Sequence, residues 1–200
     1  MADDLAKRTL RAEILRARRR LTDDERRASE RALAARALEL PRMADAKVVA
    51  AYVSVGSEPG TRALLDALRA RGVRVLLPVL REDDDLDWGV YEGAHSLVEV
   101  PLGAGRMTLL EPGGARAGVD AVLAADVVLL PGLAVDRRGM RLGRGGGSYD
   151  RVLARLAAAG AAPALVVLLY DAELRDTVPT EPHDRPVTAA ATPSGIHPFG

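Results

Sequence analysis

Residues 126–150 read DVVLLPGLAVDRRGMRLGRGGGSYD, and this stretch decides the fold. It opens with a short apolar, β-branched run that is typical of a buried strand. A loop with glycines at positions 139, 143, 145, 146 and 147 follows. Ser148 is then expected to cap a helix over residues 148–159, which Gly160 closes. A strand, a glycine-rich loop and a helix in this order predict one unit of an α/β fold.

The rest of the chain continues the alternation of strands and helices. Apolar runs predict buried strands at residues 47–53, 73–78, 125–130 and 164–169, with weaker strand signals at 86–91 and 187–192. Helices are expected at residues 3–20, 22–40 and 61–71. This order predicts an α/β fold of three layers, in which helices cover both faces of a mostly parallel sheet. The fold is expected to be Rossmann-like without a dinucleotide fingerprint, because no G-x-G-x-x-G lies at the first strand. No repeat or long linker divides residues 1–200, so a single domain is expected.

The N-termini of three expected helices have suitable cap residues. Asp3 or Asp4 is expected to cap the first helix, and Thr61 the third. Thr22 followed by Glu25 matches a capping box for the second helix.

Composition excludes several classes of protein. The 200 residues include no Cys, so disulfides, thiolate nucleophiles and Cys-ligated metal centres are excluded. No apolar run approaches the roughly 20 residues that span a bilayer, and the N-terminus lacks the apolar core of a secretion signal. We therefore expect a cytoplasmic protein without a membrane partner. The acidic run at residues 82–85 is expected to form a solvated turn.

The net charge is zero, since 28 Lys and Arg residues balance 28 Asp and Glu residues. This balance argues against a nucleic-acid partner. The first 42 residues, however, hold 12 basic and 8 acidic side chains, a net charge of +4. A nucleic-acid-associated protein that uses these basic helices is therefore kept as an alternative.

The glycine-rich loop has the properties of a polyphosphate site. Glycines let backbone N–H groups approach an anion, and the following helix N-terminus adds a partial positive charge. Arg141 and Arg144 add side chains that can bind phosphate through two hydrogen bonds. A flexible loop with solvated arginines is the alternative. Asp150 either stabilises the helix dipole at the surface or holds Mg²⁺.

The pattern P-G-x-x-x-D-x-x-G-x-R-L-G-x-G-x-G-x-Y-D at residues 131–150 resembles the signature of the 5-formyltetrahydrofolate cyclo-ligase family, also called 5,10-methenyltetrahydrofolate synthetases. Other segments resemble family elements in the same order: residues 7–11 (KRTLR), 54–61 (SVGSEPGT), Pro78, 111–112 (EP) and 178–184 (VPTEPHD). The similarity therefore covers nearly the whole chain.

The resemblance implies an ATP- and Mg²⁺-dependent ligase that acts on the small molecule 5-formyltetrahydrofolate. In this family the formyl oxygen attacks the γ-phosphate, which gives an N5-iminium phosphate and ADP. N10 then closes the ring, and phosphate leaves to give 5,10-methenyltetrahydrofolate. We expect a monomer. A catalytically weak folate- or nucleotide-binding protein of the same fold is the alternative.

The resemblance also implies roles for individual residues. The expected nucleotide-binding residues are Lys7, Arg11, Arg141, Gly143, Arg144, Gly145, Gly146, Gly147, Ser148 and Tyr149. Arg144 and Tyr149 are the expected catalytic residues. Lys7 and Arg11 lie four residues apart, on one helical face, and without the resemblance they would indicate a solvated basic face.

Substrate and metal residues follow from the same resemblance. Val53, Glu58 and Tyr149 are expected to bind the folate, and Asp150 and Asp184 to bind Mg²⁺. A carboxylate at position 58 can accept hydrogen bonds from the 2-amino group and N3–H of a pterin. On spacing alone, Glu58 is an ordinary loop residue before a turn.

Three positions depart from the family pattern. Ser148 replaces a usual Tyr, Met107 stands where an aromatic residue often precedes the Glu-Pro element, and Glu173 stands where Gln is common. The departures at Met107 and Glu173 affect the expected substrate contacts more than the ATP site. His183 is expected to position Asp184, and Trp88 to lie in the core.

Overall fold

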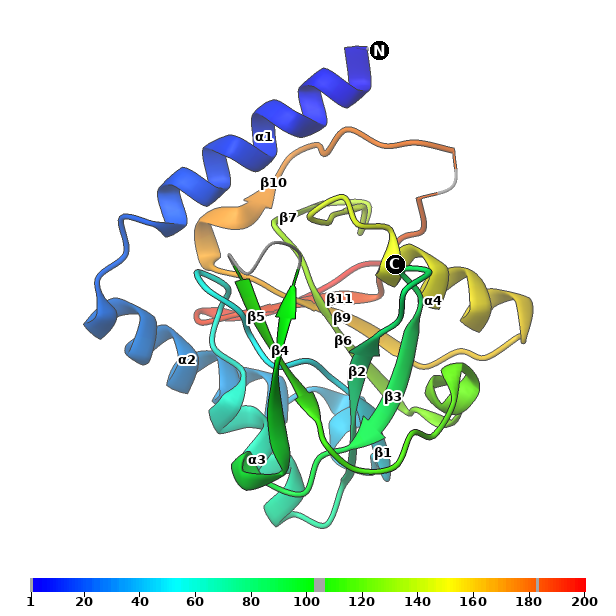
Figure 1. Cartoon of the computed structure of the whole chain (residues 1–200). Helices are drawn as coiled ribbons and strands as arrows, with labels where there is room; N and C mark the ends of the chain where they lie inside the picture. The colour runs from blue at the N-terminus through cyan, green and yellow to red at the C-terminus, as the bar shows by residue number, and fades with distance from the viewer. Residues whose placement is uncertain (1, 103–106, 183) are drawn as a thin grey trace.

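A seven-stranded sheet forms the centre of the molecule (Figure 1). The computed structural model describes residues 2–102, 107–182 and 184–200. In spatial order the strands are β12 (Gly195–Pro198), β11 (Ala189–Thr192), β9 (Ala164–Leu168), β6 (Val127–Pro131), β1 (Val48–Ala50), β2 (Arg74–Leu80) and β3 (Leu86–Val90). The five inner strands run parallel, while β3 and β12 pair antiparallel at the edges. The predicted, mostly parallel sheet is therefore confirmed.

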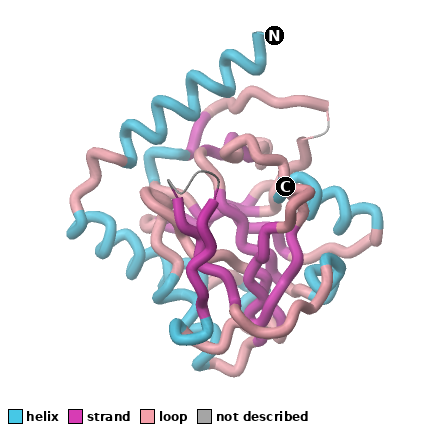
Figure 2. Tube along the Cα trace, in the orientation of Figure 1, coloured by secondary structure: helices cyan, strands magenta, loops and turns pink. Residues whose placement is uncertain are grey.

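Helices cover both faces of this sheet, as Figure 2 shows. One face packs against α2 (Asp23–Leu38) and α3 (Arg62–Ala70), and the other against α4 (Ser148–Ala158) and the 3-10 helix η3 (Val119–Ala124). Successive side chains of a strand point to opposite faces. Val127 of β6 accordingly enters the core with α2 and α3, whereas Val128 enters the core with α4. This double burial explains the unbroken apolar runs of the inner strands.

The remaining elements lie outside the three layers. They are α1 (Ala2–Arg18), the small sheet of β10 (Leu174–Arg175), β7 (Ala134–Asp136) and β8 (Arg141–Leu142), the antiparallel pair β4 (Leu97–Leu102) and β5 (Met107–Pro112), and the 3-10 helices η1 (Pro41–Met43), η2 (Ala94–Ser96) and η4 (Asp171–Glu173). The sequence reading did not predict β12, the small sheet or the β4–β5 pair. Ile14 of α1 packs against Leu133 and Leu142, so the N-terminal helix covers the small sheet. In the part of the chain that the structure describes, no helix is both long and apolar enough to span a bilayer.

The capping box of α2 is confirmed. The Glu25 N–H donates to Thr22 Oγ1 at 3.3 Å, and the Thr22 N–H donates to Glu25 Oε2 at 2.7 Å. The prediction for α1 is wrong, because the helix already begins at Ala2 and Asp3 and Asp4 lie within it.

The other two predicted caps differ from expectation. Thr61 occupies the N-cap position of α3 as predicted, but its side chain makes no cap hydrogen bond; its hydroxyl donates to the Tyr52 carbonyl oxygen at 2.8 Å and thereby ties the loop after β1 to the helix start. Ser148 is the first residue of α4 and does not cap it. The N-cap is Gly147, whose φ of 75° suits glycine and few other residues.

Candidate functional site

A pocket of about 350 Å³ lies where several strands of the central sheet end. Its walls come from residues 143–147, from the start of α4, and from residues that follow β1 and end β6. Leu80, Leu86 and Leu109 supply apolar surface. In α/β proteins with parallel sheets, ligands bind at this carboxyl edge. The pocket is thus in the place where the fold itself predicts a binding site.

The glycine-rich loop reaches the pocket by a less direct route than predicted. The chain leaves β6, forms the antiparallel pair β7–β8, and only then enters residues 143–147. Gly145 and Gly147 adopt φ values of 100° and 75°, which disfavour residues with a side chain. Gly143, Gly145, Gly146, Gly147 and Ser148 all line the pocket. The predicted loop and helix start therefore do meet at one cavity.

Arg141 is held at the base of this loop. Its Nη2 donates to Asp150 Oδ1 at 2.8 Å, and its Nη1 donates to the Pro131 carbonyl oxygen at 3.0 Å. Burial lowers the pKa of Arg141, although the nearby Asp150 opposes this shift. Its Nε is buried and has no partner among the described residues. Arg141 is therefore a fixed and nearly enclosed cation, not a solvated one.

Arg144 and Glu58 meet across the pocket. Arg144 Nε lies 3.2 Å from Glu58 Oε1, and the side chains are 36% and 10% exposed, respectively. The Val55 N–H donates to Glu58 Oε2 at 2.8 Å. Burial raises the pKa of Glu58, while this hydrogen bond and the positive charges of Arg144 and Arg18 oppose the rise. Glu58 is thus a buried, oriented carboxylate and not an ordinary loop residue.

The N-terminal helix brings Lys7 and Arg11 to the loop. Lys7 is buried, and its Nζ donates to Glu181 Oε2 at 2.7 Å and to Asp184 Oδ2 at 2.9 Å. Burial lowers the pKa of Lys7, but the hydrogen bonds and negative charges of Glu181 and Asp184 together outweigh it, so the net shift is upward. Arg11 Nε donates to the Gly143 carbonyl oxygen at 2.9 Å. A solvated basic face at these two positions is therefore excluded.

The two carboxylates expected to bind Mg²⁺ both lie near Arg141. Asp150 forms the ion pair described above, and Asp184 contributes to the charge that acts on the Arg141 guanidinium. Asp184 Oδ2 also accepts the Glu181 N–H at 2.8 Å. Within residues 2–102, 107–182 and 184–200, no three His, Cys, Asp or Glu side chains gather as a metal site. Two carboxylates suit Mg²⁺, which usually takes its other ligands from water and phosphate.

Three more side chains line the pocket. Val53 is there as predicted, and so is Tyr149, whose buried hydroxyl has no partner among the described residues. Burial and the nearby Glu58 raise the pKa of Tyr149, so its hydroxyl stays protonated. Tyr52, which the sequence reading missed, also lines the pocket with a buried and unpartnered hydroxyl. The sequence signal that could have identified Tyr52 was its position next to Val53, at the end of the first predicted strand.

The departures from the family pattern fall in different places. Ser148 lines the pocket, whereas Glu173 is buried away from it and pairs with Arg18 at 2.6 Å. His183 and the side chain of Met107 lie outside the described part of the structure. Trp88 is fully buried in the core, as expected.

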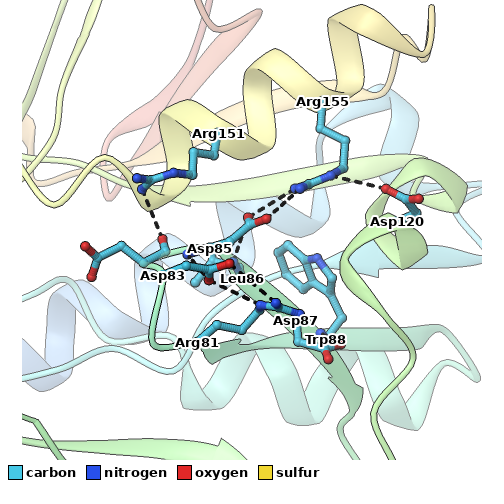
Figure 3. Close-up of polar contacts among 10 residues, drawn as sticks. Arg81, Asp83, Asp85, Leu86, Asp87, Trp88, Asp120, Arg151 and Arg155 are labelled. Carbon is cyan, nitrogen blue, oxygen red and sulfur yellow. Dashed lines mark hydrogen bonds and ion pairs between the residues drawn. The ribbon is translucent and has the colours of Figure 1, made fainter.

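The acidic turn between β2 and β3 is fastened to α4 (Figure 3). Arg155 donates to both carboxylate oxygens of Asp85, at 3.2 and 2.6 Å, and also pairs with Asp120. Arg151 donates to the Asp84 carbonyl oxygen at 3.3 Å. Asp83 and Asp84 are exposed as expected, but Asp85 is not a solvated residue. The turn is thereby held to the helix that begins at the glycine-rich loop.

Comparison with known proteins agrees with this geometry. Residues 3–193 match the 5-formyltetrahydrofolate cyclo-ligase family. The chain is 45% identical to a 5-formyltetrahydrofolate cyclo-ligase of Mycolicibacterium smegmatis over 152 residues, which is 74% of each chain. It is 32% identical to one from Escherichia coli K12 over 183 residues, covering 92% of this chain and 98% of the relative.

Solved structures show the same similarity. The NMR structure of 5,10-methenyltetrahydrofolate synthetase from Aquifex aeolicus superposes with a TM-score of 0.78 at 25% identity, over 96% of this chain and 92% of that one. The synthetase from Mycoplasma pneumoniae, at 19% identity and a TM-score of 0.70, shares the fold over 94% and 98%. The chain belongs to the 5-formyltetrahydrofolate cyclo-ligase family.

Proposed function

We propose that this protein converts 5-formyltetrahydrofolate to 5,10-methenyltetrahydrofolate, with ATP and Mg²⁺, and releases ADP and phosphate. The contact between Arg144 and Glu58 is the main support for this proposal. It brings a cation of the glycine-rich loop and a buried carboxylate into one pocket, so a triphosphate and a pterin bound to them would lie side by side. Holding two reactants in contact supplies much of the rate of a reaction between them.

The nucleotide end is assigned to the glycine-rich loop. Backbone N–H groups of residues 145–148 and the N-terminus of α4 provide donors and partial positive charge for the β- and γ-phosphates. Arg141 and Arg144 add full charges, and Lys7 and Arg11 of α1 close this end from the other side. Arg144 is the more exposed of the two loop arginines, so we assign it to the transferred phosphoryl group once it exchanges Glu58 for phosphate.

Asp150 and Asp184 are assigned to Mg²⁺. Both supply hard oxygen ligands near the phosphate-binding arginine Arg141. Mg²⁺ held by these two carboxylates would supply positive charge that offsets the negative charge of the phosphates.

The folate end is assigned to Glu58, Val53 and the apolar wall of Leu80, Leu86 and Leu109. Glu58 in its ionised form can accept hydrogen bonds from the 2-amino group and N3–H of the pterin. The protonated Tyr149 hydroxyl has no competing partner among the described residues and can donate to an oxygen of either substrate.

In the first step the formyl oxygen forms a bond to the γ-phosphorus, and the bond to the β,γ-bridging oxygen breaks so that ADP leaves. In the second step N10 bonds to the formyl carbon, N10 loses its proton, and the carbon–oxygen bond breaks to release phosphate. Both nucleophiles belong to the substrate, so the protein's tasks are positioning and charge neutralisation. A chain without Cys is well able to perform them.

A binding protein of the same fold without turnover is the second candidate, favoured by Ser148 in the pocket where an aromatic ring is usual. The two candidates are separated by a spectrophotometric assay for the methenyl product. We expect product only when ATP, Mg²⁺ and 5-formyltetrahydrofolate are all present. Calorimetric binding of the folate without product would select the second candidate.

A further inference from the structure

Arg18, the last residue of α1, is a buried cation that the proposed mechanism does not use. Its residue exposure is only 2%. Its Nε and Nη2 donate to the two carboxylate oxygens of Glu173 at 2.6 and 2.8 Å, and Nη2 also donates to the Gly132 carbonyl oxygen at 2.7 Å. Removing two charges from water is costly, and well-packed apolar residues often stabilise a fold equally well. Stability alone therefore does not explain a buried pair at this position.

The Arg18–Glu173 pair is connected to the folate end of the pocket through Tyr170. The Arg18 guanidinium lies 5.6 Å from the centroid of the Tyr170 ring. The Tyr170 N–H donates to Glu173 Oε2 at 3.0 Å, and the Tyr170 hydroxyl donates to the Glu58 carbonyl oxygen at 3.4 Å. Gly132, which receives the other Arg18 hydrogen bond, itself lines the pocket. A continuous set of contacts thus runs from the end of α1 to the loop that presents Glu58.

The charge of Arg18 also reaches the Glu58 carboxylate. Burial raises the pKa of Glu58, and the positive charges of Arg144 and Arg18 oppose that rise. Among the described residues, the hydroxyls of Tyr52 and Tyr149 lie near Glu58 and stay protonated, and the Tyr170 hydroxyl donates to the Glu58 carbonyl oxygen. Glu173, paired with Arg18, adds negative charge beside Tyr52. Arg18 is therefore a fixed source of positive charge behind Glu58, while Arg144 can leave to meet phosphate.

We propose that Arg18 is a positioning residue for folate binding: with Glu173 and Tyr170 it holds the Glu58 loop in place and keeps the Glu58 carboxylate ionised when Arg144 turns to the nucleotide. This inference rests on the role of Glu58 in the proposed function. It also explains Glu173, a departure from the family pattern, as the ion-pair partner that holds Arg18 in place.

Two substitutions that break the same ion pair test this inference. Arg18→Met removes a positive charge behind Glu58, whereas Glu173→Gln removes a negative one. The affinity for 5-formyltetrahydrofolate is measured calorimetrically without ATP from pH 5 to 8. The pH midpoint at which affinity is lost on the acid side is compared between the wild-type protein and the two variants. Arg18→Met should raise the midpoint by about one pH unit, which corresponds to a tenfold loss of affinity at pH values below the midpoint. Glu173→Gln should lower the midpoint. Shifts in the same direction, or no shift, would overturn the inference, because mere loss of structure affects both variants alike.

Two control variants complete the design. Glu58→Gln should abolish the pH step, which identifies Glu58 as its source. Arg18→Lys keeps the charge but loses the paired hydrogen bonds, so it should keep the wild-type midpoint with weaker affinity. If Arg18→Met does not fold, the other two variants still test the inference. Arg18→Lys should then keep the wild-type midpoint, and Glu173→Gln should lower it. If the wild-type protein does not bind the folate, the proposed function fails; if it binds and the midpoints do not diverge, only the inference fails.

Discussion

Arg144 Nε lies 3.2 Å from Glu58 Oε1, so a cation assigned to phosphate is paired with the carboxylate assigned to the pterin. The same pattern recurs at Arg141 with Asp150, at 2.8 Å, and at Lys7 with Asp184, at 2.9 Å. In each pair the cation is a predicted phosphate ligand, and the anion is a predicted ligand of the folate or of Mg²⁺. In the unliganded protein these charged side chains neutralise one another. On this account, ATP, Mg²⁺ and folate replace the partner of each side chain when they bind.

This exchange predicts that Glu58→Gln binds ATP more tightly when no folate is present. The substitution releases Arg144 from its ion pair, and we expect a gain of about threefold, since a partly exposed pair contributes up to about 1 kcal/mol. Folate binding should weaken by about 10- to 100-fold through loss of charge-assisted hydrogen bonds. Calorimetric titration with ATP and Mg²⁺ measures the first effect.

Arg144→Ala and Arg137→Ala are the matched controls for that measurement. Arg144→Ala should weaken ATP binding, whereas Arg137 is 82% exposed and pairs with Asp176, so Arg137→Ala should bind ATP normally. Unchanged or weaker ATP binding by Glu58→Gln would contradict the exchange of partners.

The raised pKa of Glu58 predicts a pH-dependent gain in stability for the same variant. Burial raises this pKa in the folded protein, so the folded state binds more protons than the unfolded state. The contribution of Glu58 to stability is therefore present at low pH and is lost as the pH rises through the folded-state pKa. Glu58→Gln is neutral at every pH and should melt a few degrees above wild type at pH 7.5, with the difference vanishing near pH 4. Thermal melts across this range check the result, and a lower Tm at pH 7.5 would be inconsistent with it.

Asp150→Asn is expected to raise the Mg²⁺ concentration needed for ATP binding. The amide keeps the shape of the side chain and can still accept a hydrogen bond from Arg141, but it loses the charge that attracts the cation. We expect about tenfold more Mg²⁺ at half-maximal ATP binding, measured by titration of Mg²⁺ at fixed ATP. A wild-type requirement would remove Asp150 from the metal site. Asp45→Asn, at an exposed position between α2 and β1, is the control.

Arg155→Met is expected to destabilise the fold more than Arg27→Met does. Arg155 makes a bidentate pair with Asp85, and their side chains are only 21% and 15% exposed, so the variant leaves a sparsely solvated carboxylate without its partner. The cost should be about 1–3 kcal/mol in the free energy of unfolding. Arg27 pairs with Asp24 on the open surface of α2, where the loss should stay below about 0.5 kcal/mol. Urea unfolding measures the free energy of unfolding of both variants. Equal losses would show that the Arg155–Asp85 pair in Figure 3 adds no stability beyond that of a surface ion pair.

Local signals in the sequence predicted the sheet and the glycine-rich loop. The run at β6 was recognisable because a strand buried on both faces needs apolar residues at every position. The cap of α4 was placed one residue too late, at Ser148, because Ser is a common N-cap residue, whereas the cap is Gly147 with a positive φ. The β4–β5 pair was missed because the Glu-Pro-Gly-Gly run at residues 111–114 is typical of a loop, although Glu111 and Pro112 end β5. Local patterns predict elements well but say little about such irregular pairings.

The ion pairs of the site could not be predicted in the same way. The run of Arg residues near the end of α1 does not reveal which of them is buried, because that depends on how the helix packs. Only the spacing of Lys7, Arg11, Ile14 and Arg18 along one helical face contained this information. The pairing of Arg144 with Glu58 joins segments that are distant in the chain and depends on the tertiary fold.

Formation of the methenyl product tests the central claim most directly. Purified protein is mixed with 5-formyltetrahydrofolate, ATP and Mg²⁺, and the product is followed spectrophotometrically beside phosphate release. We predict one phosphate released for each methenyltetrahydrofolate formed, with neither product when ATP is omitted. Folate binding without product, or phosphate release without the methenyl compound, would contradict the account.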